Sequence, residues 1–447
     1  MGWRRNTEVR HTEPRLSLLL RALRHRNYRL YFAGQSISLI GTWMTRLATS
    51  WLVWRLTRSA DVLGLLGFVG QLPTFLLAPF AGVWVDRLNR HRLLIVTQAL
   101  AMVESFVLAA LALSGTIQVW QILVLQALQG GINAFDMPTR QALLVDLIED
   151  RADLPNAVAL NSSMVNAARL IGPSIAGLLI AWVGEGWCFL ADGVSYLAVI
   201  ASLLAMGVIA RRPARSTHKV LHELRDAVRY VHGFAPIRAI LLLLVLLGLV
   251  GMPYTVLLPV IAARTLHGGA HTLGFLMGAM GVGALAGALF LATRRTVLGL
   301  GRLIPLAAGT FGISLIALGL SRSLPLSLVL MAVTGVGFMI QMAASNTLVQ
   351  VLVREEMRGR VMALYIMAFM GMTPFGSLLA GAIAARVGAP ETVLGCGVIC
   401  VIGAVVFARK LPALRAIARP VYVERGILPA VATGIGTATN LREETGQ

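Results

Sequence analysis

Residues 237–262 read IRAILLLLVLLGLVGMPYTVLLPVIA, a run in which Arg238 is the single charged residue. The hydrocarbon core of a bilayer is about 30 Å thick, and an α-helix rising about 1.5 Å per residue needs about 20 apolar residues to cross it. The run is therefore long enough to form one transmembrane helix.

The composition extends this conclusion to the whole chain. Its 447 residues are 57% hydrophobic and 13% charged, and the mean hydropathy is +0.76. Ordinary soluble domains carry roughly 25% charged residues. The sequence thus excludes a water-soluble globule and predicts a polytopic, all-α integral membrane protein.

About twelve apolar runs of spanning length follow one another, separated by charged or Gly- and Pro-containing breaks. The first set of predicted spans is 28–52, 60–84, 92–114, 118–140, 157–182 and 187–210. The second set is 237–262, 270–293, 302–321, 324–347, 358–386 and 391–409. We expect no cleavable signal peptide, because the chain starts polar and Arg-rich rather than with a short apolar run.

These runs divide the chain into five segments, namely an N-terminal tail (1–27), a first bundle (28–210), a linker (211–236), a second bundle (237–409) and a C-terminal tail (410–447). The linker has apolar residues at helical spacing. It is either an amphipathic helix on the membrane surface or a solvated helix without lipid contact. The C-terminal tail is polar and is expected to be disordered.

The formal charge of +19 has a topological explanation. Of 39 Lys and Arg residues, the loops on one predicted side hold five, namely Arg55, Arg58, Arg264, Arg322 and Arg386. The positive-inside rule then places both termini and the linker in the cytoplasm, with the protein in a bacterial inner membrane. The charge therefore requires no nucleic-acid partner.

The two halves repeat. Residues 176–184 read AGLLIAWVG and residues 380–388 read AGAIAARVG, while Leu63 and Gly64 match Leu273 and Gly274. Same-sense repeats of about six spans indicate two bundles related by an axis along the membrane normal, with a cavity between them near the midplane.

The loop after the second span reads GVWVDRLNRHR, from Gly82 to Arg92. Gly82 permits a close helix approach, and Asp86 can sit at the positive N-terminal end of another helix. The basic side chains of this loop favour anionic lipid or acidic partners, and they are Arg87, Arg90 and Arg92.

This loop resembles the major facilitator superfamily. Five further stretches resemble its enterobactin-exporter-like branch, which includes macrolide and multidrug efflux pumps: IGTWM from Ile40, GGINAFDMPTRQA from Gly130, NAVALNS from Asn156, NTLVQ from Asn346 and RGRVMALY from Arg358. The resemblance covers about residues 20–410 and implies alternating access between two six-helix bundles.

The resemblance also implies that Asp86 latches the bundles together on the cytoplasmic side and stabilises an outward-open state, with the receiving helix near Gly359. The matching loop of the second half has Thr296 at the Asp86 position, so the latch is asymmetric. The alternative is that the loop only anchors the chain by its positive charge.

The fifth span carries AARLIGPSIAG, with Gly172, Pro173 and Gly177. Small residues let helices pack closely in lipid, and proline bends a helix. The motif resembles an exporter and antiporter signature, although Ala168 and Ala176 stand where that signature has glycine. Ordinary small-residue packing is the alternative.

Charges inside spans cost at least about 2.5 kcal/mol at the bilayer centre unless paired or hydrated. In the resembling fold the first and fifth spans border the cavity, so Arg46 and Arg169 are candidate contacts for an anionic or hydrogen-bonding part of a substrate. The alternative is an internal salt bridge, to Asp136 or Glu104.

Other polar residues complete the candidate site. Asp136 can pair with Arg140 at i, i+4. The further candidates for substrate contact are Asn133, Asp136, Gln341 and Asn346, with helix–helix hydrogen bonding as the alternative. Buried carboxylates can carry protons, and the candidates for coupling are Asp136, Glu104 and Asp192.

Several site classes are absent from the sequence. There is no Walker A loop, no catalytic triad and no metal-ligand spacing, since His267 and His271 lack an acidic partner. The cysteines, Cys188, Cys396 and Cys400, are expected to serve packing. We expect no cofactor and no enzyme activity.

The sequence therefore predicts a monomeric secondary transporter, a proton-driven exporter of a small amphipathic compound such as a drug or siderophore. An importer of an anionic metabolite is the second hypothesis, and a non-transporting membrane receptor or scaffold is the third.

Overall fold

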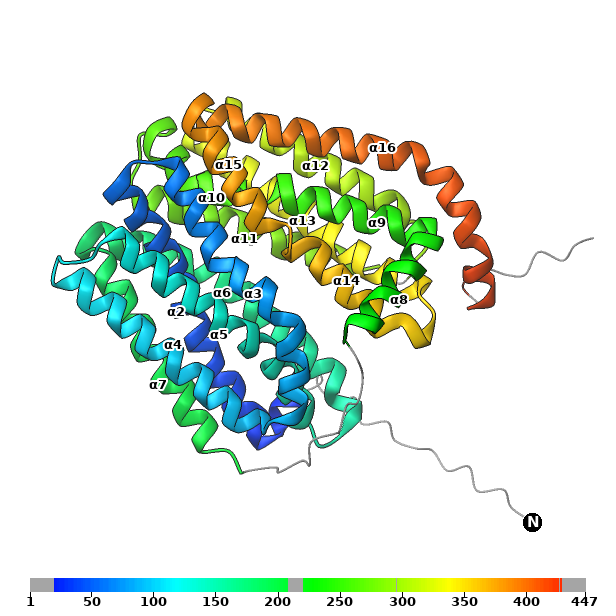
Figure 1. Cartoon of the computed structure of the whole chain (residues 1–447), viewed down its shortest axis with the longest axis horizontal. Coiled ribbons are helices and arrows are strands. Elements are labelled where there is room, and N and C mark those ends of the chain that lie inside the picture. The colour runs from blue at the N-terminus through cyan, green and yellow to red at the C-terminus, as the bar shows by residue number, and fades with distance from the viewer. Residues whose placement is uncertain (1–19, 208–219, 295, 426, 428–447) are drawn as a thin grey trace, which may run out of the picture.

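A computed structural model of the chain describes residues 20–207, 220–294, 296–425 and 427, without the side chains at positions 79, 83, 86 and 220–223. All regular elements in these ranges are helical (Figure 1). The all-α class is thereby confirmed.

The first half forms one bundle, seen at the lower left of Figure 1. Its elements are η1 (Arg21–Arg24), α2 (Arg26–Thr57), α3 (Ala60–Arg87), α4 (Arg90–Leu113), α5 (Val119–Asp146), η2 (Arg151–Asp153), α6 (Leu154–Val183) and α7 (Glu185–Leu204).

The second half forms the other bundle. Its elements are α8 (Val220–Gly233), α9 (Ala235–Leu246), η3 (Leu247–Gly251), α10 (Tyr254–Val260), η4 (Ile261–Thr265), α11 (Ala270–Ala292), α12 (Leu300–Leu320), α13 (Leu324–Leu352), η5 (Glu355–Met357), α14 (Arg358–Met370), α15 (Thr373–Val387) and α16 (Ala389–Glu424). The run from α9 to η4 forms one crossing and the run from α14 to α15 another, so the element order fits twelve crossings.

Within the described residues, 10 helices are long and apolar enough to cross a membrane. The two long helices outside that set are α2 and α5, which are 32 and 28 residues long. Each carries charge inside its predicted span, at Arg46 in α2 and at Asp136 and Arg140 in α5. These two helices also carry the candidate site residues Arg46, Asn133 and Asp136.

The bundles meet near one end, which we call the far end, where α2 ends and α3 begins. The opposite end, where α2 begins and α16 ends, is the terminal end. Helix α3 packs on α15, and α6 packs on α11. Helices α14 and α15 form one crossing, and α14 is the part nearer the terminal end. Helix α14 packs on α8, α9 and η3 of its own bundle. The two bundles are thus joined at the far end and diverge toward the terminal end (Figure 1).

Repeated glycines make these contacts possible. A Cβ on Gly381 would lie 2.7 Å from the Cα of Gly64, and a Cβ on Gly274 would lie 3.1 Å from the Cα of Gly177. These are the glycines that the sequence repeat pairs, Gly64 with Gly274 and Gly177 with Gly381. The repeat therefore supplies both inter-bundle contacts, because only glycine permits backbones to approach this closely.

Helix α8 occupies part of the predicted linker, and its buried side chains include Ala227 and Val231. The Tyr230 hydroxyl accepts a hydrogen bond from the Arg354 backbone N–H at 3.3 Å. One face of α8 thus lies against the C-terminal bundle. Residues 211–219 of the linker, and residues 208–210 before it, lie outside the described residues.

The predicted C-terminal tail needs a correction. Helix α16 continues to Glu424, so the expectation of disorder from residue 410 is wrong up to that point. Buried Leu414 and Ala418 show why, since one face of this extension packs on the bundle. Residues 428–447 lie outside the described residues.

Candidate functional site

Two arginines share one tryptophan ring at the junction of α2 and α6. The Arg46 guanidinium carbon lies 4.8 Å from the Trp43 ring centroid, and that of Arg169 lies 5.2 Å from it. Arg46 is exposed, and Trp43 and Arg169 are half-buried. We call these three residues the Arg–Trp–Arg cluster.

Helical spacing and one glycine build the cluster. Trp43 and Arg46 stand three residues apart on α2, and Arg169 and Gly172 stand three residues apart on α6, so each pair shares a helix face. A Cβ on Gly172 would lie 2.6 Å from the Trp43 Cβ and 2.8 Å from the Ile40 carbonyl oxygen. The glycine of the fifth-span motif thus lets α6 approach α2 and brings Arg169 to the ring.

Within the described residues, neither arginine of the cluster has a carboxylate partner. The Arg169 Nε is buried without a hydrogen-bond partner. Across the bundle interface, Tyr254 of α10 lies within electrostatic range of Arg169. The alternative of an internal salt bridge to Asp136 or Glu104 is therefore not realised in this conformation.

The Asp136 carboxylate is paired with residues of α4 and α5, and not with the arginines of the cluster. The buried carboxylate forms the expected i, i+4 ion pair with Arg140. It also accepts hydrogen bonds from the Gln98 Nε2 at 2.6 Å and the Thr97 Oγ1 at 3.0 Å. Its hydrogen bonds thus connect α5 to α4, and the ion pair with Arg140 neutralises its charge.

The other two acids form a separate buried pair. Asp192 of α7 accepts hydrogen bonds from Thr45 at 2.8 Å and from Ser105 at 2.9 Å through one carboxylate oxygen. Its second oxygen and the Glu104 Oε1 are buried without partners. Glu104 of α4 lies within electrostatic range of Asp192. Within the described residues, neither carboxyl group forms an ion pair with a basic side chain.

A largely buried polar stripe on α2 runs beside these acids, and sequence reasoning missed it. Its residues recur every three or four positions, at Tyr31, Gln35, Ser38, Thr42 and Thr45. Both side-chain polar atoms of Gln35, the Tyr31 hydroxyl and the Ser38 hydroxyl are buried without partners. The Thr42 hydroxyl contacts the Tyr196 hydroxyl at 3.4 Å. The stripe therefore leads from the terminal half of α2 to Thr45 and Asp192.

The three amide residues predicted to contact substrate differ in burial and in hydrogen bonding. Asn133 is half-buried, Gln341 is fully buried, and Asn346 accepts a hydrogen bond from Gln350 at 2.6 Å. The Gln341 amide bonds to Ser345 on its own helix at 3.2 Å. Gln341 is thus closed off from any ligand in this conformation, and a substrate role for these residues stays a prediction.

The predicted latch residues lie apart from a receiving helix here. A Cβ on Gly82 or on Gly359 would meet nothing within 4 Å. Arg90 forms an ion pair with Asp146 at 2.9 Å, and Arg87 and Arg92 are exposed. The Asp86 side chain lies outside the described residues. The latch stays a prediction for a conformation in which the terminal end is closed.

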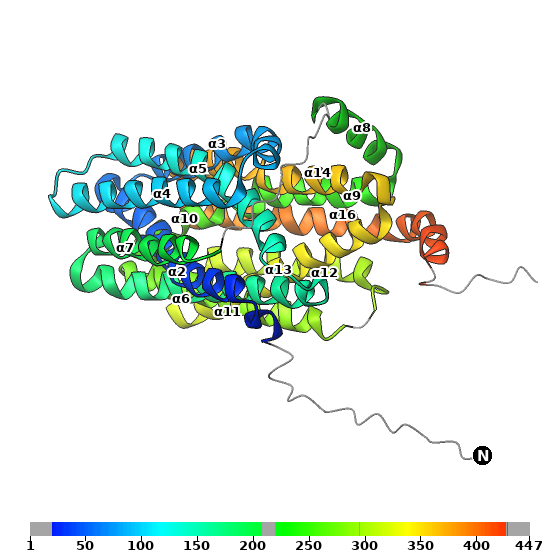
Figure 2. The same cartoon turned by 90° about the horizontal axis from the view of Figure 1, so that it is seen from below.

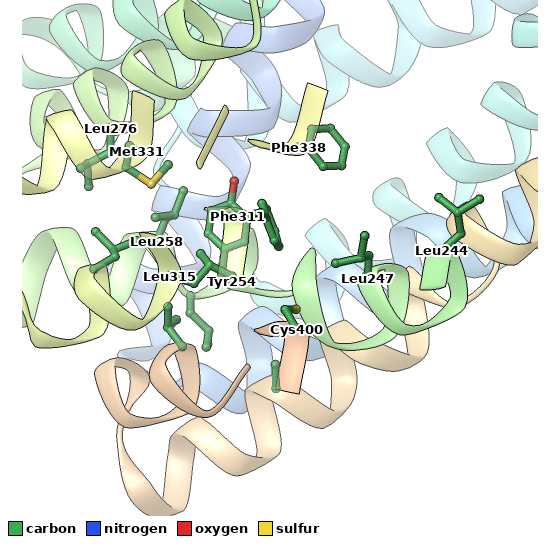
Figure 3. Close-up of a cluster of buried hydrophobic side chains, with 14 of the residues drawn as sticks. Leu244, Leu247, Tyr254, Leu258, Leu276, Phe311, Leu315, Met331, Phe338 and Cys400 are labelled. Atoms are coloured by element: carbon green, nitrogen blue, oxygen red, sulfur yellow. The ribbon is translucent and has the colours of Figure 1, made fainter. Parts of the chain in front are cut away.

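Metal and thiol chemistry find no support in the described part of the chain. No group of three or more His, Cys, Asp and Glu residues there is placed to hold a metal ion. The cysteines are unpaired, and Cys188 and Cys400 are buried. Cys400 packs against Gly251 of η3 and lies below the aromatic rings of Tyr254 and Phe311 (Figure 3).

A family model described as "Transmembrane secretion effector" matches residues 19–425 of this chain. The chain belongs to this family. It is therefore a multi-pass membrane transporter of the bacterial major facilitator type that acts on small molecules, and it is not an enzyme.

Known transporters resemble the chain over most of its length. The Staphyloferrin A transporter of Staphylococcus aureus is 28% identical over 377 residues, which cover 83% of this chain and 93% of that protein. The Multidrug efflux pump Tap of Mycolicibacterium fortuitum is 28% identical over 392 residues, covering 84% and 93% of the two chains.

A solved structure shares the fold at low sequence identity. A bacterial homologue of the human lysosomal transporter Spinster, in an inward-facing and unoccupied conformation, superposes with a TM-score of 0.63 at 14% identity. The match covers 91% of this chain and 98% of that one. The major facilitator fold predicted from the sequence is thereby confirmed.

Proposed function

We propose that this transporter is a proton-driven exporter of a small amphipathic organic compound, such as a drug or a siderophore. The Arg–Trp–Arg cluster carries the proposal. The names of the relatives, a siderophore transporter and a multidrug efflux pump, agree with this substrate range.

The cluster suits a ligand that carries an anionic or hydrogen-bond-accepting group beside an aromatic or apolar part. Guanidinium groups offer forked donors that stay charged, and the Trp43 ring offers a flat apolar face. Leaving two uncompensated cations inside a membrane protein is costly, and an anionic ligand offsets that cost. Substrate contact is therefore the use that best explains why both arginines lack a carboxylate.

The conformation agrees with a transport cycle. If the terminal end faces the cytoplasm, as the distribution of basic residues predicts, the structure is inward-facing and the substrate enters from inside. Separation of the far-end glycine contacts would then open the opposite path. The Asp86 latch would form in that second state, when the terminal ends of the bundles approach.

The buried acid pair is the proposed coupling site. Thr45, which donates to Asp192, immediately precedes Arg46 of the cluster on α2. A change in the charge of Asp192 therefore acts on a helix turn that also holds a substrate contact. We assign proton binding to Asp192 and Glu104 rather than to Asp136, because Asp136 is already neutralised by Arg140.

Direction and flux test the proposal. A susceptibility panel in a pump-deficient host identifies a compound to which the chain confers resistance. Cells that lack the protein should then accumulate that compound, and proteoliposomes should show flux of it. Depletion of the compound in cells that lack the protein would support the importer of an anionic metabolite. The absence of flux in any direction would support a receptor or scaffold.

Topology is tested separately. Single cysteines introduced near residue 20 and at Arg425 should both react with a membrane-impermeant reagent only after the cytoplasmic side is opened. Labelling from outside would contradict the predicted inner-membrane orientation with both termini in the cytoplasm.

A further inference from the structure

A cavity of about 370 Å³ lies at the terminal end of the C-terminal bundle, apart from the Arg–Trp–Arg cluster. Its volume is within the roughly 300–1,000 Å³ of typical ligand sites. Its walls are formed by residues of α9, α12, α13, the loop before α12 and the second half of α16. The apolar side chains of these walls include Ile240, Leu348, Leu352, Phe407, Leu411 and Leu414.

Three arginines line the same cavity, Arg302 of α12 and Arg415 and Arg419 of α16. Arg302 and Arg419 are exposed and Arg415 is half-buried. Within the described residues, none of the three has an ion pair or a side-chain hydrogen bond. No acidic residue lines the cavity. It thus combines an apolar wall with uncompensated positive charge.

The length of α16 places this cavity at the membrane surface. The helix has 36 residues, whereas about 20 suffice to cross the hydrocarbon core. Counted from Ala389, about 20 residues reach the region of Arg409. The residues of α16 that line the cavity run from Phe407 to Tyr422, so they begin where the headgroup layer begins. Figure 2 shows this end of α16 extending past the other helices.

We propose that the cavity binds an anionic phospholipid. Its phosphate would lie between Arg302, Arg415 and Arg419, and part of an acyl chain would lie along Leu352, Phe407 and Leu411. Guanidinium groups match phosphate oxygens in geometry and charge, and basic pockets at the ends of transmembrane helices favour anionic headgroups. The bound lipid would connect the extension of α16 to α9, α12 and α13.

The test uses full-length protein, purified in detergent, stripped of lipid and then given either phosphatidylglycerol or phosphatidylcholine. Native mass spectrometry counts bound lipid, and thermal unfolding reports stabilisation, since a ligand of the folded state raises the unfolding midpoint. We expect a retained phosphatidylglycerol adduct and a rise in midpoint that phosphatidylcholine does not produce. Equal binding of the two lipids would overturn the proposal.

Two matched variants separate the cavity from general surface charge. Arg415→Gln/Arg419→Gln should weaken phosphatidylglycerol binding roughly tenfold or more, the scale of one lost charged contact. Arg409→Gln/Lys410→Gln removes the same charge from the same helix outside the cavity and should leave binding unchanged. Equal losses in both variants would contradict a specific site.

A third variant separates a lipid from a soluble anion. Leu352→Trp fills the apolar wall and keeps the arginines, so it should abolish the lipid adduct while leaving any binding of inorganic phosphate unchanged. Arg302→Gln provides a second charge variant if the double variant does not fold. Retention of phosphatidylglycerol by Leu352→Trp would show that the apolar wall is not used, and would refute the lipid assignment.

Discussion

The two bundles are sequence repeats, yet their interiors differ in polarity. In the described residues, all buried carboxylates belong to the N-terminal half, and they are Glu104, Asp136, Asp153, Glu185 and Asp192. The buried polar residues of the C-terminal half are Ser, Thr and Gln alone. Its centre is instead aromatic and aliphatic, with Phe311 between Tyr254 and Phe338 at ring distances of 6.1 Å each (Figure 3).

This difference suggests a division of roles on one repeated scaffold. The repeat preserves what both halves need, the glycines that join the bundles at the far end. Under our proposal, charge recognition and proton coupling are concentrated in the N-terminal bundle, while the C-terminal bundle supplies an apolar wall. The following predictions test that division, from the largest expected effect to the smallest.

Removal of both cluster charges should have the largest effect. A hydrogen bond to a charged group contributes roughly 1.5–3 kcal/mol, so Arg169→Gln should raise the substrate Kd about tenfold and Arg46→Gln/Arg169→Gln about a hundredfold. Binding to the purified protein measures this. Arg386→Gln, at the far end of the C-terminal bundle, is the control. Unchanged affinity in a well-folded double variant would exclude the direct role.

Gly381→Ala should shift the conformational equilibrium. The new Cβ would lie 2.7 Å from the Gly64 Cα, and overpacking typically costs about 1–3 kcal/mol. Because this cost falls on the conformation closed at the far end, we expect a shift of roughly 5- to 150-fold toward the other state.

Spin labels at Val145 of α5 and Gln350 of α13 would report this shift as a shorter distance between the terminal ends. Gly395→Ala is the control, since a Cβ there meets nothing within 4 Å. An unchanged distance distribution in Gly381→Ala would show that the glycine contact does not determine the state.

Gly172→Ala should disturb the cluster and the packing of α6 on α2. Its Cβ would lie 2.6 Å from the Trp43 Cβ, so we expect a loss of about 1–3 kcal/mol in stability together with weaker binding. Thermal unfolding and binding of the same sample measure both effects. Gly131→Ala, whose nearest neighbour would be 4.0 Å away, should change neither. Wild-type behaviour of Gly172→Ala would remove the positioning role.

Tyr254→Phe in the C-terminal bundle should have the smallest effect. The hydroxyl donates to the Met280 sulfur at 2.9 Å, a neutral hydrogen bond whose net contribution is about 0.5 kcal/mol at the low end of the usual range. Substrate affinity should change roughly twofold at most. A tenfold loss would assign substrate recognition to both bundles and contradict the division.

Much of the fold was predictable because apolar length is a local property of the sequence. The extension of α16 was not, because Arg409, Lys410, Pro412 and Pro420 resemble the start of a polar tail. The helix persists there because Leu414 and Ala418 face the bundle. That contact depends on the tertiary arrangement, which no local pattern contains.

The candidate site was predictable only where a local sequence pattern marks its residues. Arg46 and Arg169 were identified as charges inside spans, but their common neighbour Trp43 is an apolar residue in an apolar helix. Its spacing of three from Arg46 was an available signal. The polar stripe from Tyr31 to Thr45 was also available as a helical period, but each hydroxyl alone is tolerated in a membrane helix.

Proton-driven uptake into inside-out proteoliposomes tests the proposed division most directly. With an imposed pH gradient, wild-type protein should accumulate substrate above its equilibrium level, while Asp192→Asn should only equilibrate it and should still exchange it. Accumulation by Asp192→Asn at the wild-type level, or indifference of the wild-type protein to the gradient, would contradict coupling through the N-terminal bundle.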